Sequence, residues 1–334
     1  MLFTTTARVP SSQPPRPRKP TLLVVFVHGF IGTEESFSNF PSDLQQVLKP
    51  LTKSRSVKCE VYPSYQTKGD FNQAVLSFSR WLKNLVRQRE TDRGYCKNAD
   101  GVKVVLCGHS MGGMLIADAL LHLHVDCLHR GELWPRIIAC IAFDSPFFGV
   151  DPVSVLEALA PVQATLDLFM ETADSIKFEL PVIGGPATAM ASRTLRYAVF
   201  QYAFFGLVLY IGGKCLYKVS TAIADYWKFI RCTFEGTKGN LIGATVKVAK
   251  LRNVRFSVLY AAHNPPSSSS MKTFVCLPDR KDPAFKHFHP IHNTRVNNVI
   301  QGHISMFTPK SNSAYSSLVK DVAKKIGSTL FQNV

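Results

Sequence analysis

The chain has 334 residues, of which 46% are hydrophobic and 19% are charged, so it can build a core and is neither disordered, collagenous nor coiled coil. Lys and Arg outnumber Asp and Glu by 39 to 23, and the formal charge of +16 suits an anionic lipid surface or nucleic acid. No zinc module or aromatic RNA-binding signature accompanies the charge, which argues against nucleic acid as a partner.

The N-terminus and the cysteines bear on the cellular compartment. Five prolines between positions 10 and 20 interrupt any signal peptide or transit helix, so residues 1–20 are expected to be a flexible basic tail, with mitochondrial import as the alternative. The eight cysteines are scattered without a CxxC pair, as reduced thiols are. We therefore expect an intracellular protein, cytoplasmic or associated with an intracellular membrane, and not a secreted one.

Strands and helices are predicted to alternate through the first half of the chain. Residues 22–27, LLVVFV, have the continuous apolar character of a buried parallel strand. Residues 57–62 alternate as an edge strand does, with Tyr62 on the wetter face. Asp70 is placed to cap a helix whose apolar stripe recurs at three- and four-residue steps, at Phe71, Val75, Phe78, Leu82 and Leu85.

The same alternation continues to residue 150 and returns near the C-terminus. Strands are predicted at 102–107 and 137–143, with a helix from Met111 between them, which is the pattern of an α/β sheet with crossover helices. Short β-rich runs follow at 256–262 and 272–277, and Leu318, Val322 and Ile326 mark a closing helix. The prediction is one α/β domain formed by residues 21–150 and 251–334, with residues 151–250 inserted between them.

One pentapeptide carries a chemical signal. Gly108-His109-Ser110-Met111-Gly112 fits G-x-S-x-G directly after a predicted strand and before a predicted helix. Such a turn strains the serine backbone, and Gly108 and Gly112 let strand and helix approach each other. The Ser110 hydroxyl is therefore a candidate nucleophile above the sheet edge.

A nucleophilic serine needs donors for the oxyanion that its attack creates. His28-Gly29-Phe30 follows the first buried strand, where a glycine lets the next amide turn into the site. The backbone N–H groups of Phe30 and Met111 are the predicted oxyanion hole. His28 lies at the strand end and is expected to brace this loop rather than act as a base.

Three segments resemble the α/β-hydrolase superfamily, in particular its HG-X lipases and the serine esterases related to GPI inositol deacylases: VVFVHGFIG, VVLCGHSMGG and GHISMF. The resemblance covers residues 22–150 and 254–330. It implies an α/β-hydrolase fold, a mostly parallel sheet with helices on both faces and a lid or cap insertion. It also implies Ser110 as nucleophile, Phe30 and Met111 as oxyanion donors, and a late histidine as base, without a cofactor.

Several histidines could be that base. His303 is preferred because Gly302 precedes it and apolar residues at 304, 306 and 307 can anchor its loop, but the order Ser, acid, His also permits His287, His289 or His292. The spacing of these three could suggest metal ligands. No Cys or carboxylate completes a usual zinc pattern, so no metal site is expected.

The triad acid is missing from its usual place. The strand at 256–262 leads to Asn264 and not to a carboxylate. Two carboxylates remain as candidates: Asp144, which ends a buried strand where the similar pancreatic-type lipases carry their acid, and Asp279. A dyad without an acid, or Asn264 orienting the ring, also remains open, and Asp144 could instead hold its own turn through an Asx-type bond.

The insertion contains the most apolar stretch of the chain. Residues 198–213 are 16 residues with Gln201 as the single polar side chain, and as a helix they would reach only about 24 Å of a roughly 30 Å hydrocarbon core. Basic residues flank them at Arg193, Arg196, Lys214 and Lys218. We expect either a peripheral or re-entrant membrane contact through residues 193–218, or a lid helix over the site.

Together these features predict a serine hydrolase, a lipase or esterase that cleaves a lipid or another hydrophobic acyl ester through an acyl-enzyme. The alternative is a catalytically weak or inactive hydrolase fold that acts as a scaffold or lipid-binding protein at a membrane. An acyltransferase using the same serine is a third hypothesis.

Overall fold

A computed structural model describes residues 19–30, 32–52, 55–65, 70–91, 101–128, 131–151, 239–264 and 271–331. Most of the predicted tail and most of the predicted insertion, including residues 193–218, lie outside these described residues. The predictions of a lid and of a membrane contact therefore remain predictions. Within the described part, no helix combines the length and the apolar character needed to cross a membrane.

The centre of the molecule is a seven-stranded sheet in the order β2-β1-β3-β4-β5-β6, with β7 also paired to β5. All its pairs are parallel except the one between β5 and β6. The strands are β1 (Thr21–Val27), β2 (Ser56–Val61), β3 (Val102–His109), β4 (Ile137–Phe143), β5 (Arg255–His263), β6 (Lys272–Thr273) and β7 (Phe288–His292). The predicted mostly parallel sheet is thus confirmed.

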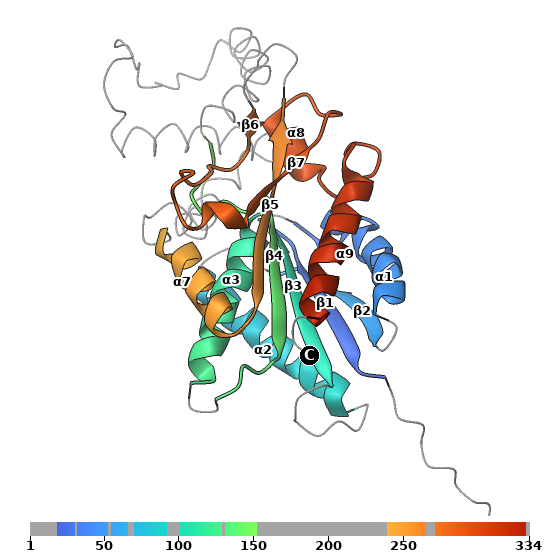
Figure 1. The fold of residues 1–334 in the computed structure, drawn as a ribbon, viewed down its shortest axis with the longest axis vertical. Helices are drawn as coiled ribbons and strands as arrows, with labels where there is room; N and C mark the ends of the chain where they lie inside the picture. The colour runs from blue at the N-terminus through green and yellow to red at the C-terminus, as the bar shows by residue number, and fades with distance from the viewer. Residues whose placement is uncertain are drawn as a thin grey trace, which may run out of the picture.

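Helices cover both faces of this sheet (Figure 1). On one face lie α2 (Phe71–Thr91), α3 (Met111–Asp126) and α7 (Gly239–Leu251), and on the other lie α1 (Phe40–Leu51) and α9 (Tyr315–Phe331). Three shorter helices complete the described elements: η1 (Glu34–Phe37), η3 (Phe285–His287) and α8 (Val299–Ile304). Because both faces are covered, every residue of β1, β3 and β4 is buried, which explains their continuous apolar sequences.

Two local predictions near the edges of the sheet were wrong. Tyr62 was expected on the wet face, but it is buried against the rings of Phe78 and Trp81 of α2, with centroids 5.1 and 4.9 Å away. The β-rich run at 272–277 shortens to β6 and one bridge between Val150 and Val275. In both places a neighbouring element, and not the local alternation, decides the outcome.

Two other elements were not foreseen from the sequence. β7 has the sequence FHPIH, in which a proline and two histidines hide the strand pattern, yet it pairs along β5 from Phe288 to His292. Residues 239–250 were assigned to the insertion, but as part of α7 they pack against α3 in the helix layer. The layered core therefore resumes before the predicted boundary at residue 250.

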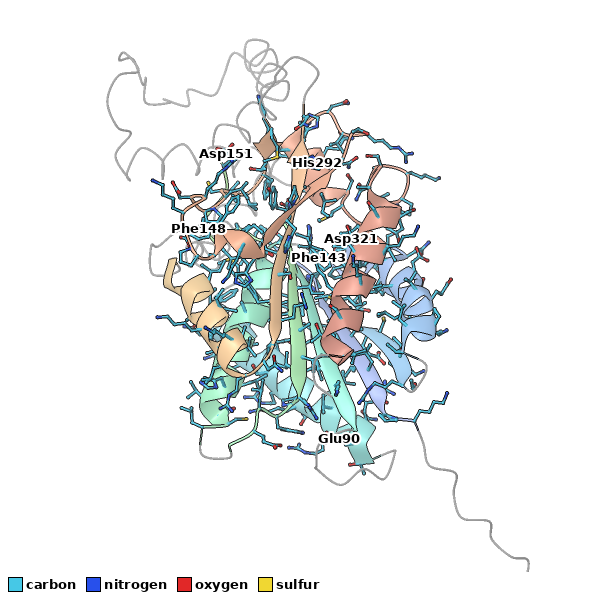
Figure 2. The ribbon with its side chains drawn as sticks, in the orientation of Figure 1. Glu90, Phe143, Phe148, Asp151, His292 and Asp321 are labelled. Atoms are coloured by element: carbon cyan, nitrogen blue, oxygen red, sulfur yellow. The ribbon has the colours of Figure 1, made fainter. Side chains whose placement is uncertain are left out.

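The parallel strands β1, β3, β4 and β5 all end at the same edge of the sheet. Phe143, at the end of β4, lies centrally, Phe148, Asp151 and His292 lie above it, and Glu90 of α2 lies near the opposite end (Figure 2). Ligands of open α/β sheets bind at the carboxyl ends of the strands. The residues that follow β1, β3 and β4 are therefore the ones to examine for chemistry.

Candidate active site

Ser110 stands in the tight turn between β3 and α3. Its backbone has φ 54° and ψ −125°, a region that residues with a side chain rarely adopt. The Ser110 N–H donates to the carbonyl of Phe143 at 2.8 Å, which ties the turn to the end of β4. The strained turn expected from the G-x-S-x-G pattern is therefore present.

The glycines around Ser110 are required by close backbone approach. A Cβ on Gly108 would lie 2.3 Å from the Gly112 carbonyl oxygen, and one on Gly112 would lie 2.2 Å from the Val27 carbonyl oxygen. Gly113 is equally constrained, because its Cβ would lie 1.9 Å from Ser145 Oγ. Gly113 was not predicted from the sequence, although the Gly112-Gly113 pair after the serine was the signal for it.

His303 connects Ser110 to a carboxylate. Its Nε2 lies 3.1 Å from Ser110 Oγ, and its Nδ1 lies 2.7 Å from Asp144 Oδ2. With the Nδ1 proton donated to the carboxylate, Nε2 is free to accept the proton of the serine hydroxyl. The structure thus joins three groups that are 34 to 193 residues apart in sequence into one hydrogen-bonded series.

The surroundings of His303 differ from the expected loop. His303 lies in the last turn of α8, and the Asn298 side chain caps this helix by accepting from the Gln301 N–H at 2.8 Å. Met306 and Phe307 are buried as predicted, but Ile304 is 55% exposed and anchors nothing. The predicted anchoring by Ile304 was therefore wrong, because the helical turn directs consecutive side chains to different sides.

Asp144 is held in place by the neighbouring strand. It is fully buried, its Oδ1 accepts from the Ala261 N–H at 3.0 Å, and its own N–H donates to the Leu259 carbonyl at 2.7 Å. These bonds reach across to β5, so the carboxylate does not serve the Asx-type turn that was the competing interpretation. Its φ of 45° shows that the end of β4 is bent to bring the carboxylate there.

The other proposed partners of His303 lie elsewhere. Asp279 is exposed, and its Oδ1 accepts from the N–H of Lys281 at 2.8 Å, which accounts for it as a turn residue. Asn264 is exposed at the end of β5. Asp144 is therefore the candidate acid that contacts the imidazole.

The predicted oxyanion donors flank Ser110. Met111 is the first residue of α3, so its N–H has no acceptor within the helix. On the other side, the chain after β1 runs against the serine, since a Cβ on Gly29 would lie 2.7 Å from Ser110 Cβ and 3.3 Å from its Oγ. Phe30 follows directly, which places its amide in the segment beside Ser110.

His28 packs beneath that segment. It is fully buried, its ring stacks on Tyr65 with centroids 4.6 Å apart, and the Tyr65 hydroxyl donates to the His28 carbonyl at 3.0 Å. Burial lowers the pKa of His28, so its ring is neutral at physiological pH. This packing agrees with a brace for the loop.

Two further side chains contact His303 and were missed in the sequence. His109 Nε2 lies 3.2 Å from the His303 carbonyl oxygen, and the Phe274 ring stacks on the imidazole with centroids 4.0 Å apart. Burial first, and then the nearby His303, lower the pKa of His109 well below its ordinary value of 6.5. His109 occupies an unspecified position of the motif, and nothing local marks Phe274.

The remaining histidines of the late segment do not converge. His287 Nδ1 lies 3.1 Å from the Phe256 carbonyl oxygen, and His292 is exposed at the end of β7. Among the described residues, no group of three or more His, Cys, Asp or Glu side chains is arranged to hold a metal ion.

Comparison with solved structures gives remote similarities. The siderophore hydrolase EstB from Aspergillus fumigatus is 14% identical, with 98% of this chain and 93% of EstB covered and a TM-score of 0.47. Human thioesterase 2 is 10% identical, with 92% and 97% covered and a TM-score of 0.38. The phospholipase PlaB from Legionella pneumophila is 14% identical with a TM-score of 0.29, and the match covers 39% of this chain and only 26% of PlaB.

The sequence comparisons are more decisive. No curated protein matches the chain. The model of a family described as the alpha/beta hydrolase family matches residues 24–283, which is more than half of the chain and includes the segments that carry Ser110 and Asp144. The parallel sheet, its helices and the family match agree, and this chain belongs to the alpha/beta hydrolase family.

Proposed function

We propose that this chain is a serine hydrolase that cleaves a carboxylic ester of a lipid or of another hydrophobic acyl group. The observation that carries the proposal is the hydrogen-bonded series Ser110–His303–Asp144, with 3.1 Å and 2.7 Å between the paired atoms. A hydroxyl, an imidazole and a buried carboxylate in this order are what acyl transfer through a serine requires.

The proposed reaction has two steps. His303 Nε2 accepts the Ser110 proton while Oγ attacks the ester carbonyl, and the N–H groups of Phe30 and Met111 hold the oxyanion. The imidazolium, oriented by Asp144, then protonates the leaving alcohol as the carbon–oxygen bond breaks. In the second step His303 takes a proton from water, and the water oxygen attacks the acyl carbonyl. The bond between the acyl carbon and Ser110 Oγ then breaks, and His303 returns the proton to Oγ as the acid leaves.

A hydrophobic substrate is favoured by what surrounds the base. Phe274 covers the imidazole, and Ile304, directly after His303, is 55% exposed. The apolar residues 198–213, with their basic flanks, add a proposed peripheral membrane contact of an intracellular enzyme. The resemblance of the VVFVHGFIG segment to HG-X lipases supports the same class of substrate.

A non-catalytic scaffold has less support. This alternative was suggested by the lack of a carboxylate directly after β5. Asp144, at the end of the neighbouring strand β4, contacts His303 instead. The proposal therefore favours a complete catalytic series over a retained but inactive fold.

The test is labelling by a fluorophosphonate probe, followed by hydrolysis of acyl esters of increasing chain length. The wild-type chain should be labelled and should prefer long acyl chains, and Ser110→Ala should abolish both signals. Ser317→Ala, which makes the same change at an exposed serine of α9, is the matched control and should behave as wild type. A wild-type protein that is never labelled and hydrolyses no ester would overturn the proposal.

A further inference from the structure

The imidazole of His303 lies between two other rings. The Phe274 ring is 4.0 Å away with an interplanar angle of 26°, and the His109 ring is 4.6 Å away at 31°. Two rings this close and this nearly parallel cannot share one face of an imidazole, since each covers the area of the whole face. Phe274 and His109 therefore cover opposite faces of His303.

Two backbone hydrogen bonds hold the segment that carries Phe274. Its carbonyl accepts from the Asp151 N–H at 2.9 Å, and the Cys276 N–H donates to the Gly149 carbonyl at 2.9 Å. The side chain itself is buried. The ring is therefore held against the imidazole by the segment that follows β4.

The two rings differ in what they do to a charge on His303. The face of a phenyl ring is electron-rich and attracts a cation, whereas a protonated His109 would repel one. Burial keeps His109 neutral, because it lowers the pKa of that histidine well below 6.5. The Phe274 ring therefore attracts the His303 imidazolium, and the neutral His109 ring does not repel it.

We propose that Phe274 is a positioning residue for the base: it clamps the His303 imidazole against His109 and stabilises its protonated form through the phenyl face. The inference rests on the proposed role of His303 as the general base. It adds a fourth side chain, which acts on the imidazole of His303.

Several titratable groups surround the imidazole and must be separated from this effect. Asp144 faces it from the end of β4, and His109 faces it from the end of β3, with His28 of the β1 end acting on His109. His263 stands at the end of β5, the strand on which α8 packs. None of these groups is altered when Phe274 is replaced, so a change in the His303 signal or in the labelling rate reports on the phenyl ring.

The experiment compares Phe274→Leu with Phe274→Tyr, which keeps the ring, and with Phe288→Leu. Phe288 is as buried as Phe274, with 6% against 7% exposure, but its ring contacts are with Phe148 and Tyr260 and not with His303, so it is a matched control. The Nδ1–H signal of the His303 imidazole, which reports its bond to Asp144, is followed by NMR, and the rate of fluorophosphonate labelling is measured at pH 7.5. Circular dichroism verifies folding, and Phe274→Met replaces the Leu variant if that variant does not fold.

In Phe274→Leu the Nδ1–H signal of His303 should shift or broaden because the imidazole is no longer clamped, and the labelling rate at pH 7.5 should fall roughly threefold to tenfold because the imidazolium that forms in the attack loses the phenyl face. The Tyr variant and Phe288→Leu should resemble wild type. An unchanged Nδ1–H signal and labelling rate in a folded Phe274→Leu protein, or an equal change in Phe288→Leu, would overturn the inference. Wild-type protein that resists labelling would refute the proposed function, and the Nδ1–H signal of His303 alone would then decide the role of Phe274.

Discussion

Replacing Asp144 by Asn tests whether this residue, and not Asp279 or Asn264, is the acid of the proposed triad. The carboxylate makes two bonds, from Ala261 N–H to Oδ1 and from His303 Nδ1–H to Oδ2. In an asparagine the oxygen must stay on the Ala261 side, because an NH₂ group placed there would face another donor. The amide NH₂ then points at His303 Nδ1 and forces its proton onto Nε2.

The consequence for chemistry follows from this tautomer. An imidazole that carries its proton on Nε2 cannot accept one from Ser110, and loss of the carboxylate costs a Ser-His-Asp triad about 10⁴-fold in kcat. We therefore expect Asp144→Asn to slow probe labelling by about 10³- to 10⁴-fold, or roughly 4 to 5.5 kcal/mol of transition-state stabilisation. The bond to Ala261 survives in neutral form, so the free energy of unfolding should fall by only about 1 to 2 kcal/mol.

The assay is the labelling rate at pH 7.5, with urea denaturation to verify the fold, and Asp279→Asn is its control. Asp279 is the other carboxylate considered from the sequence, and it is exposed and bonded to the backbone of Lys281, so its variant should keep the wild-type rate. If Asp144→Asn kept most of the labelling rate while Asp279→Asn lost it, the assignment of the acid would be refuted.

Two further predictions concern stability. Gly112→Ala should destabilise the fold by several kcal/mol or prevent folding, since its Cβ would lie 2.2 Å from the Val27 carbonyl oxygen. In Gly243→Ala the added Cβ in α7 meets no atom within 4 Å, so this variant should stabilise the fold by about 0.5 to 1 kcal/mol. Urea denaturation measures both effects. The pKa of His109 is lowered in the folded state, so as pH falls below the ordinary value of 6.5 the unfolded chain binds a proton at this residue while the folded chain does not. The free energy of unfolding is therefore unaffected by His109 above pH 6.5 and decreases below it, by up to about 1.4 kcal/mol per pH unit. The melting temperature between pH 7.5 and 5 should therefore fall less steeply in His109→Gln than in wild type, and parallel curves would contradict this reasoning.

Local sequence was sufficient to predict the strand–turn–helix around Ser110 and the buried strands beside it. Continuous apolar runs such as 22–27 and 137–143 have one stable solution in a covered parallel sheet, so their burial could be foreseen. The glycines at 108 and 112 indicated a close approach of backbones, which the structure contains. Signals of this kind lie within a few residues of the feature that they predict.

Only the tertiary structure decided which groups meet at the sheet edge. The choice of Asp144 over Asp279 depends on β4 lying next to β5, and the clamp of His109 and Phe274 on His303 depends on strands that end at the same edge. Contacts across more than 150 residues leave no periodicity in the sequence, because they are set by how whole elements pack. For that reason Ser110 could be singled out in the sequence, while the carboxylate that contacts His303 and the other surroundings of that imidazole required the fold.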